Sequence, residues 1–203
     1  IMDIPRMDSP KIPKPLRVGV KLGDVKTLLD AAQNCRDKLI VSLLADTGLR
    51  RSEACDIKWG DIDRENDTIR VWGKGAKQRV VRFGPVTRCL LTEWHGESKS
   101  EVANLLFGLK PTGLQHVLRR LEKRTGIRCN AHAFRRTFAS ESIRNGLNIF
   151  YVQSLLGHSS LAMTRIYAEQ VSSEDAIKAY KPIVTREGAG LESAETWPTT
   201  LTK

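Results

Sequence analysis

The 203-residue sequence has no long apolar run, and none of its hydrophobic stretches approaches the ~20 residues that a membrane-spanning helix needs. Its N-terminal stretch also lacks the apolar core of a secretory signal peptide. The four cysteines, at positions 35, 55, 89 and 129, form no C-x-x-C pair. This spacing disfavours both a disulfide framework and a structural zinc site, so we expect a cytoplasmic protein without a bound metal.

Acidic residues are also in short supply, because 23 Asp and Glu face 33 Lys and Arg, which gives a formal net charge of +10. Hydrophobic residues make up 40% of the chain, which is enough for one sizeable core. A basic balance of this size indicates a polyanionic partner, with nucleic acid as the first candidate. A surface that is merely basic and solvated is the alternative.

The two ends differ in composition from the middle of the chain. Residues 1–19 carry four prolines, which disfavour helix, and we interpret them as an interdomain linker whose upstream domain is absent from this sequence. Residues 183–203 mix Gly, Ser, Thr and Pro and predict a C-terminal tail. Residues 20–182 are then expected to form the folded domain.

Within that domain the apolar periodicity is mostly helical. Two β-branched runs, 68–72 and 79–83, interrupt it, and the glycine-containing segment between them predicts a hairpin. Gly48 is a predicted helix stop, and Asn130 is a predicted N-cap. We therefore predict a mainly α fold with a small antiparallel β-sheet (α+β), with helices over residues 24–34, 36–48, 51–59, 86–95, 112–126, 130–146, 149–157, 160–170 and 172–180.

Four short motifs contain the candidate functional residues: TGLRRSE from residue 47, GKGAKQR from 73, HAFRR from 132, and LLGH from 155, with a tyrosine at 167. Each motif alone has an ordinary explanation, such as a surface ion pair, a solvated lysine or a helix end. Helical spacing does not decide between Arg50 and Arg51, or between Arg135 and Arg136, as the functional member of each pair.

Taken together and in this order, the motifs resemble the catalytic domain of the tyrosine recombinases, the phage integrase family, over about residues 20–182. The resemblance implies that a tyrosine hydroxyl attacks a DNA phosphate, which leaves a 3′-phosphotyrosyl link and a free 5′-hydroxyl. It also implies that no cofactor or metal takes part. The resemblance selects the nucleophile and five other catalytic residues: Tyr167, Arg50, Arg135, Lys74, His132 and His158.

The implied roles agree with the chemistry of these side chains. Arg50 and Arg135 would stabilise the charge on the phosphate, since guanidinium offers paired donors and stays protonated. Lys74 would protonate the leaving oxygen, while His132 would exchange a proton with Tyr167. His158 would donate a hydrogen bond to the phosphate. Glu53, on the same helical face as Arg50, would orient an arginine or a histidine.

The resemblance further implies double-stranded DNA as the partner and a homotetramer on DNA. The basic segment 110–128 suggests phosphate contacts. Arg136 departs from the family pattern, which very often has a second histidine at that position. The residues expected to contact DNA are Lys77, Arg79, Arg119, Arg120, Lys123, Arg124 and Arg136.

Tyr151 and Tyr180 are interpreted as packing residues, since neither stands at the expected distance after the LLGH motif. Three other readings stay open. The chain could be a type IB topoisomerase or telomere resolvase, a non-catalytic DNA-binding regulator with this fold, or a simple helix-turn-helix module. All expected reactive residues are present, which favours the recombinase.

Overall fold

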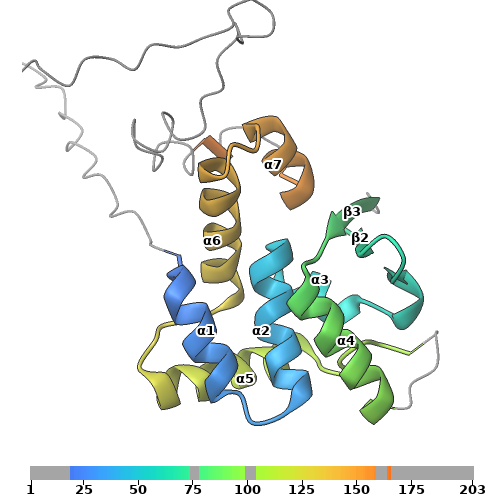
Figure 1. Ribbon diagram of the computed structural model, residues 1–203, viewed down its shortest axis with the longest axis vertical. Helices are drawn as coiled ribbons and strands as arrows, with labels where there is room; N and C mark the ends of the chain where they lie inside the picture. Colours follow the sequence, from blue (N-terminus) through green and yellow to red (C-terminus); the bar gives the residue numbers. More distant parts are fainter. Residues whose placement is uncertain (1–18, 74–77, 99–103, 159–163, 166–203) are drawn as a thin grey trace, which may run out of the picture.

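The computed structural model describes residues 19–73, 78–98, 104–158 and 164–165. Helix α2 (Cys35–Thr47) forms the centre of this part of the chain. It begins at Asn34, whose side chain accepts a hydrogen bond from the backbone N–H of Asp37 at 2.8 Å. Every residue from Leu39 to Leu44 is buried, because α1 (Leu22–Ala31), α4 (Pro85–Ser98) and α6 (Ala131–Arg144) all pack against it (Figure 1).

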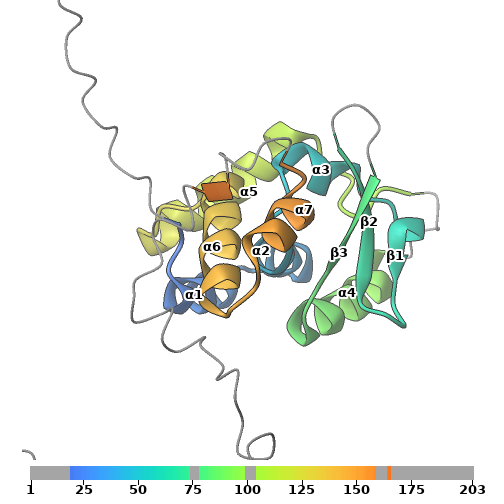
Figure 2. The ribbon, with the colours of Figure 1, turned by 90° about the horizontal axis from the view of Figure 1, so that it is seen from above.

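The strands form one small antiparallel sheet in the order β1 (Ile62–Asp63), β2 (Thr68–Trp72) and β3 (Gln78–Arg82). Figure 2 shows the sheet to one side of the helices. Its inward face buries Ile69, Val71 and Val81, while its outward face leaves Trp72 and Val80 exposed. The strand period of two therefore assigns each residue of β3 either to the core or to solvent.

Helix α5 (Pro111–Thr125) crosses beneath α1 and α2 in Figure 1 and packs on α1 and on the short helix α3 (Arg51–Asp56). Its apolar residues, spaced three or four apart, are all buried, and they are Leu114, Val117, Leu118 and Leu121. A single 3₁₀ turn, Trp59–Asp61, links α3 to the sheet.

Helix α7 (Ile149–Leu156) packs against α6 through a small separate cluster in which Ala139, Val152 and Leu156 are buried. The same helix contacts β3, so it bridges α6 and the sheet (Figure 2). Gly157 ends α7 in the left-handed conformation, with φ 62°.

The predicted fold class is confirmed, as are the stop at Gly48 (φ 59°) and the cap at Asn130, whose side chain accepts from Ala133 N–H at 2.9 Å. Strand β1 was not predicted, because two residues are too few to show a period. Two expectations were wrong. The helix predicted over 51–59 ends at Asp56, where Ile57 is extended (ψ 132°). Tyr151 is 65% exposed rather than packed.

The helices predicted over 160–170 and 172–180 lie outside the described residues, apart from positions 164 and 165. The tail 183–203 and nearly all of the linker 1–19 lie outside them as well. Among the described helices, none combines the length and the apolar character needed to cross a membrane.

Candidate functional site

Arg50 and Glu53 stand at the start of α3, directly after the loop that ends α2. The backbone N–H of Arg50 donates to Glu53 Oε2 at 2.8 Å, and Arg50 Nη1 donates to Oε1 at 2.7 Å. Glu53 thus caps the helix and fixes the guanidinium at the same time. The Glu53 side chain is 5% exposed, whereas that of Arg50 is 34% exposed and keeps one side open to solvent.

Arg79 of β3 approaches the same carboxylate from the other side. Its Nη1 donates to Glu53 Oε1 at 3.0 Å and its Nη2 to Oε2 at 2.7 Å, which is the paired geometry that guanidinium and carboxylate favour. Burial alone would raise the pKa of Glu53, but the hydrogen bonds from Arg79 and Arg50 outweigh it and lower the pKa to about 2. Glu53 is therefore ionised at neutral pH.

Arg135 of α6 is 4% exposed and reaches between two helix ends. Its Nη1 donates to the carbonyl of Gly48, at the end of α2, at 2.8 Å. Its Nη2 donates to the carbonyl of Leu156, at the end of α7, at 2.5 Å. A Cβ at Gly48 would lie 2.7 Å from the Phe138 ring, so only glycine fits this junction.

Three successive carbonyls at the end of α7 each accept a hydrogen bond from a different arginine. Arg79 Nε donates to Leu155 at 2.7 Å, Arg135 Nη2 to Leu156 at 2.5 Å, and Arg50 Nη2 to Gly157 at 3.2 Å. The last carbonyls of a helix lack partners within the helix and carry the negative end of its dipole, so cations are stabilised there. We call Arg50, Arg79, Arg135 and Glu53 the arginine cluster.

His158 follows directly after this helix end. Desolvation, reinforced by the charges of Arg135, Arg50 and Arg79, lowers the pKa of His158 to about 4, so the ring is neutral at pH 7. Its Nδ1 lies 2.8 Å from the hydroxyl oxygen of Thr164, which is buried. When Thr164 donates to Nδ1, the ring proton resides on Nε2, which then serves as a donor.

His132 occupies the first turn of α6 and is exposed. Partial desolvation and then the charges of Arg135, Arg136, Arg51 and Arg50 lower its pKa. A neutral imidazole can accept a proton, so the surrounding arginine charges favour the form of His132 that can act as a base.

The structure separates the two arginine pairs that spacing left open. Arg50 joins the cluster, while its exposed neighbour Arg51 donates to Gln115 of α5 at 3.2 Å. Arg135 is buried in the cluster, whereas Arg136 is only half-buried. Lys74, Lys77 and Tyr167 lie outside the described residues.

The residues expected to contact DNA differ in their surroundings. Arg119, Arg120, Lys123 and Arg124 are all exposed on α5. Arg120 also pairs with Asp37 at 3.1 Å, and Arg124 donates to the carbonyl of Ala31 at 3.1 Å. Arg79 has a side chain that is 11% exposed and turned toward Glu53, to which its Nη2 donates at 2.7 Å. The signal was present in the sequence, because Arg79 shares a strand face with Val81, and a charge on a buried face needs a partner.

Two other features stand apart from the cluster. Cys35, Glu93 and Glu97 bring potential ligand atoms to within 4.8 Å of one another, but burial raises the pKa of the Cys35 thiol to about 11, and a protonated thiol is a poor ligand. We assign no metal there.

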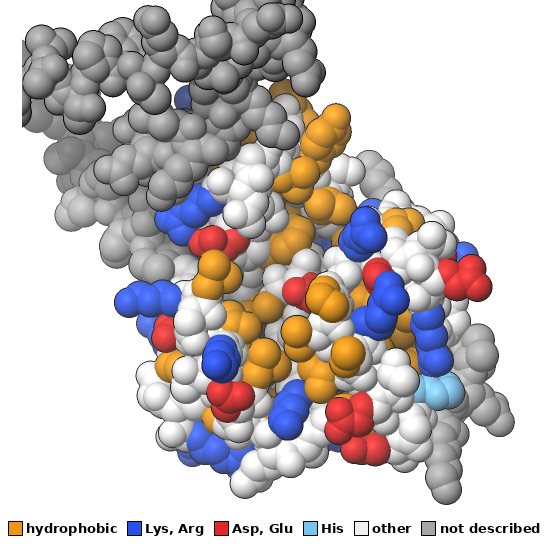
Figure 3. All heavy atoms as spheres, viewed as in Figure 1, with side chains coloured by type: hydrophobic (Ala, Val, Ile, Leu, Met, Phe, Trp, Pro, Cys, Tyr) orange, Lys and Arg blue, Asp and Glu red, His pale blue; other side chains and the backbone are white. Residues whose placement is uncertain are grey.

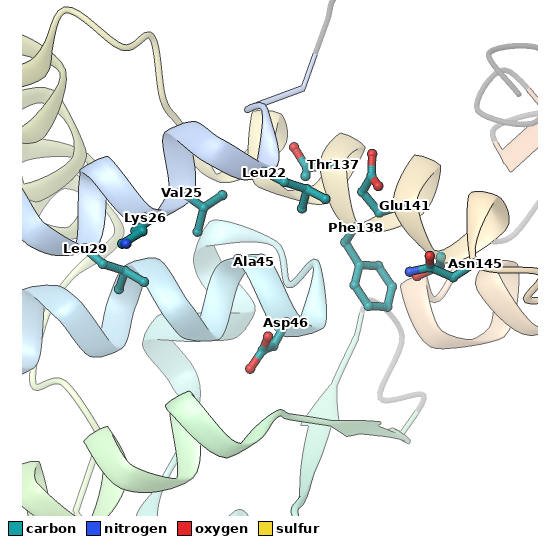
Figure 4. Close-up of a pocket in the computed structure, with 11 residues that line it drawn as sticks. Leu22, Val25, Lys26, Leu29, Ala45, Asp46, Thr137, Phe138, Glu141 and Asn145 are labelled. Carbon is teal, nitrogen blue, oxygen red and sulfur yellow. The ribbon is translucent and has the colours of Figure 1, made fainter. Parts of the chain in front are cut away.

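A pocket of about 440 Å³ between α1, α2 and α6 shares no lining residue with the arginine cluster (Figure 4). In Figure 3, hydrophobic side chains gather near the middle of one face, with basic and acidic groups interspersed around them.

A helical domain with a small sheet, whose arginines and histidine meet at one helix end, matches a known class. Residues 20–174 match the phage integrase family, and the chain belongs to that family.

Its relatives include the tyrosine recombinase XerA of Saccharolobus solfataricus, 40% identical over 166 residues, which cover 80% of this chain and 56% of the relative. XerA of Pyrococcus horikoshii is 34% identical over 194 residues, covering 89% of this chain and 67% of the relative. The chain thus spans between about half and two thirds of these relatives.

Solved structures agree on the fold. A crystal structure of XerA recombinase superposes with a TM-score of 0.71 at 30% identity, covering 85% of this chain and 65% of that one. XerH recombinase, bound to a palindromic difH substrate in a post-cleavage complex, gives a TM-score of 0.68 at 27% identity and covers 80% of this chain and 52% of that one.

Proposed function

We propose that this chain is the catalytic part of a site-specific DNA recombinase, which cuts and rejoins double-stranded DNA through a 3′-phosphotyrosine at Tyr167. The observation that carries the proposal is the convergence of Arg50, Arg135 and a neutral His158 at the end of α7. A cluster of fixed positive charge beside an uncharged donor suits a phosphate whose negative charge grows during the reaction.

Arg50 and Arg135 bind the non-bridging oxygens of the scissile phosphate. Arg50 donates one side-chain N–H to Glu53 and one to the carbonyl of Gly157. These two bonds fix the orientation of the guanidinium, which has five N–H groups and so retains donors for a phosphate. The carbonyls of Gly48 and Leu156 hold the guanidinium of Arg135 in place before the phosphate binds, so little conformational entropy is lost in the reaction. His158 donates from Nε2 to the same phosphate without adding a charge.

The Tyr167 hydroxyl loses its proton to His132 as its oxygen bonds to phosphorus, and the bond from phosphorus to the 5′-oxygen breaks. Lys74 gives a proton to that leaving oxygen, which would otherwise depart as a poor leaving group. Rejoining reverses each transfer. The lowered pKa of His132 favours the neutral form that this step requires.

The DNA partner and the assembly belong to the same proposal. XerH, a structural neighbour at 27% identity, is bound to its DNA substrate in the solved complex. We propose that this chain likewise acts on duplex DNA, and that the complete protein works as a homotetramer on two sites. The positive charge at the phosphate comes from side chains, so we expect a chelator to leave the rate unchanged.

The test is covalent capture on DNA. The complete product of the gene is incubated with a library of nicked duplexes whose core is randomised, and adducts that resist denaturant are recovered and sequenced to find the site. A nicked duplex with that site is then used for rates. We expect Tyr167→Phe to abolish the adduct while retaining non-covalent DNA binding.

Tyr151→Phe is the matched control, because Tyr151 is 65% exposed on α7 and has no assigned role. It should form the adduct at the parent's rate. An adduct that persists in Tyr167→Phe would mean that another residue is the nucleophile. A parent protein that binds DNA but forms no adduct with any library member would support the non-catalytic regulator instead.

A further inference from the structure

Arg79 is largely shielded from solvent on the inward face of β3, opposite Val71 of β2 and two residues from the buried Val81. Its side chain is 11% exposed, so its charge requires a partner within the protein. That partner is Glu53, which is separated from Arg79 by 26 positions in the sequence and is 5% exposed. Arg79 therefore belongs to the interior of the site and not to its DNA-facing surface.

Glu53 is shared between two guanidiniums. Its Oε1 accepts from Arg50 Nη1 at 2.7 Å and Arg79 Nη1 at 3.0 Å, and its Oε2 accepts from Arg50 N–H at 2.8 Å and Arg79 Nη2 at 2.7 Å. One carboxylate facing two guanidiniums leaves a positive charge uncompensated. Without Arg79, Arg50 and Glu53 would form a neutral pair, and a phosphate at Arg50 would meet the carboxylate's repulsion in full.

Arg79 also shapes the end of α7. Its Nε donates to the Leu155 carbonyl at 2.7 Å, three residues before His158. A Cβ at Gly157 would lie 3.2 Å from Arg79 Nη1 and 3.4 Å from Cζ, so the left-handed turn at Gly157 closes directly against the guanidinium. The backbone that leads into His158 is therefore packed on Arg79.

We propose that Arg79 is a positioning residue for DNA cleavage. It compensates the negative charge of Glu53, so that Glu53 does not cancel the attraction between Arg50 and the scissile phosphate. It also holds in place the helix end that precedes His158. This inference rests on the proposed function and deepens it. Arg79 touches neither DNA nor the reacting atoms, and it acts through Glu53, Arg50 and the end of α7.

The experiment measures single-turnover adduct formation at saturating protein for Arg79→Met, for Glu53→Gln and for the double variant. Each protein is tested on the nicked duplex and on the same duplex with a neutral methylphosphonate at the scissile position. We expect Arg79→Met to lose about 10²-fold on phosphate, close to the loss of one charge-stabilising donor. Because the methylphosphonate lacks the charge that Arg50 meets, the loss there should be about 10-fold or less. Adding Glu53→Gln to Arg79→Met should restore at least about 10-fold on phosphate, since the uncompensated carboxylate is gone.

Arg82→Met is the matched control, because Arg82 is exposed on the outward face of the same strand. It should change neither rate by more than about 2-fold. If Arg79→Met does not fold, as judged by circular dichroism, Arg79→Lys takes its place, because lysine keeps the charge but loses the paired geometry. For Arg79→Lys we expect a smaller loss on phosphate and almost none on methylphosphonate.

The outcomes separate the two proposals. Equal losses on both substrates, with no recovery from Glu53→Gln, would assign Arg79 to the stability of the fold alone and overturn the inference. An undiminished rate in Arg79→Met would overturn it as well. Both results leave the proposed function intact, provided that the parent forms an adduct at Tyr167. A parent that forms none ends the proposed function, and this inference with it.

Discussion

The arginines of the cluster and the arginines of α5 are the same residue type in opposite surroundings. Arg79 and Arg135 are 11% and 4% exposed and hold two or more hydrogen bonds each, whereas Arg120 is 53% exposed and pairs with one carboxylate. A buried guanidinium is fixed in place and weakly screened, while an exposed one is mobile and screened by salt. The first kind suits chemistry at one phosphate, and the second suits electrostatic attraction along a DNA backbone.

Replacing Arg135 should have the largest effect, because it serves both catalysis and the fold. We expect Arg135→Lys to lose roughly 10²–10³-fold or more in the rate of adduct formation. We also expect a loss of about 1–3 kcal/mol in the free energy of unfolding, since lysine leaves a carbonyl of Gly48 or Leu156 unsatisfied.

Single-turnover capture and urea denaturation measure the two effects of Arg135→Lys. Arg136→Lys is the control from the adjacent position and should lose less than about 10-fold in rate. A larger loss at Arg136 than at Arg135 would reverse the choice between them.

The free energy of unfolding should fall in two stages as the pH is lowered, because two groups at the arginine cluster have lowered pKa values. The pKa of His158 is lowered to about 4 from an ordinary value of 6.5, so the folded state disfavours its protonation. The contribution of His158 to the free energy of unfolding is fully present above pH 6.5 and is lost as the pH falls from 6.5 to 4. Glu53, with its pKa lowered from 4.5 to about 2, adds a second loss from pH 4.5 downward.

Urea midpoints at pH 7, 5.5 and 4 measure the first stage of this acid sensitivity. Because solvent screens the half-buried ring, we expect the unfolding free energy of the parent to fall by only about 1–2 kcal/mol over this interval. His158→Gln should reduce the change, since glutamine does not titrate, but should not abolish it, because the pKa of His132 is lowered in the same direction. An identical pH profile in His158→Gln would show that another group controls this interval.

Gly157→Ala tests whether the helix end is packed on Arg79. Gly126, at the end of α5, has φ 71° and open space around its Cβ position, so Gly126→Ala should cost about 1–2 kcal/mol for the left-handed backbone alone. Gly157→Ala should cost a further 1–3 kcal/mol or so, because its Cβ would meet Arg79 at 3.2 Å.

Urea denaturation of both variants measures the difference between Gly157 and Gly126. The excess at Gly157 should largely disappear in an Arg79→Ala background, where the obstructing side chain is removed. An excess that survives in that background would point to another source of strain.

The smallest effects are expected on α5. Arg119→Ala and Lys123→Ala should change the unfolding free energy by less than about 0.5 kcal/mol. Each should lower the slope of log affinity against log salt by about 0.9 on duplex DNA. Arg120→Ala should in addition lose about 0.2–1 kcal/mol of stability with its Asp37 contact. Unchanged salt slopes in all three would place the DNA on another surface.

Local features were predictable to a useful degree. The helix stop at Gly48, the Asn130 cap, the hairpin strands and the buried face of α5 all follow from residues within one or two turns of each other. The motif order also identified the family to which the chain belongs. Strand β1 escaped because its two residues are too few for a periodic pattern. The interpretation of Tyr151 as a packing residue was wrong, because its helix turns it outward.

What the sequence determined by itself is most of the described helices, the hairpin and the family, because periodicity, caps and motif order are written in neighbouring residues. The motif resemblance selected Arg50 over Arg51, but only the tertiary structure decided that Arg50 and Arg79 share the carboxylate of Glu53. Arg79 meets the Leu155 carbonyl across 76 positions, and Arg135 meets that of Gly48 across 87. Such contacts depend on how the helices and the sheet pack, and buried charges are stable only where that packing supplies a partner.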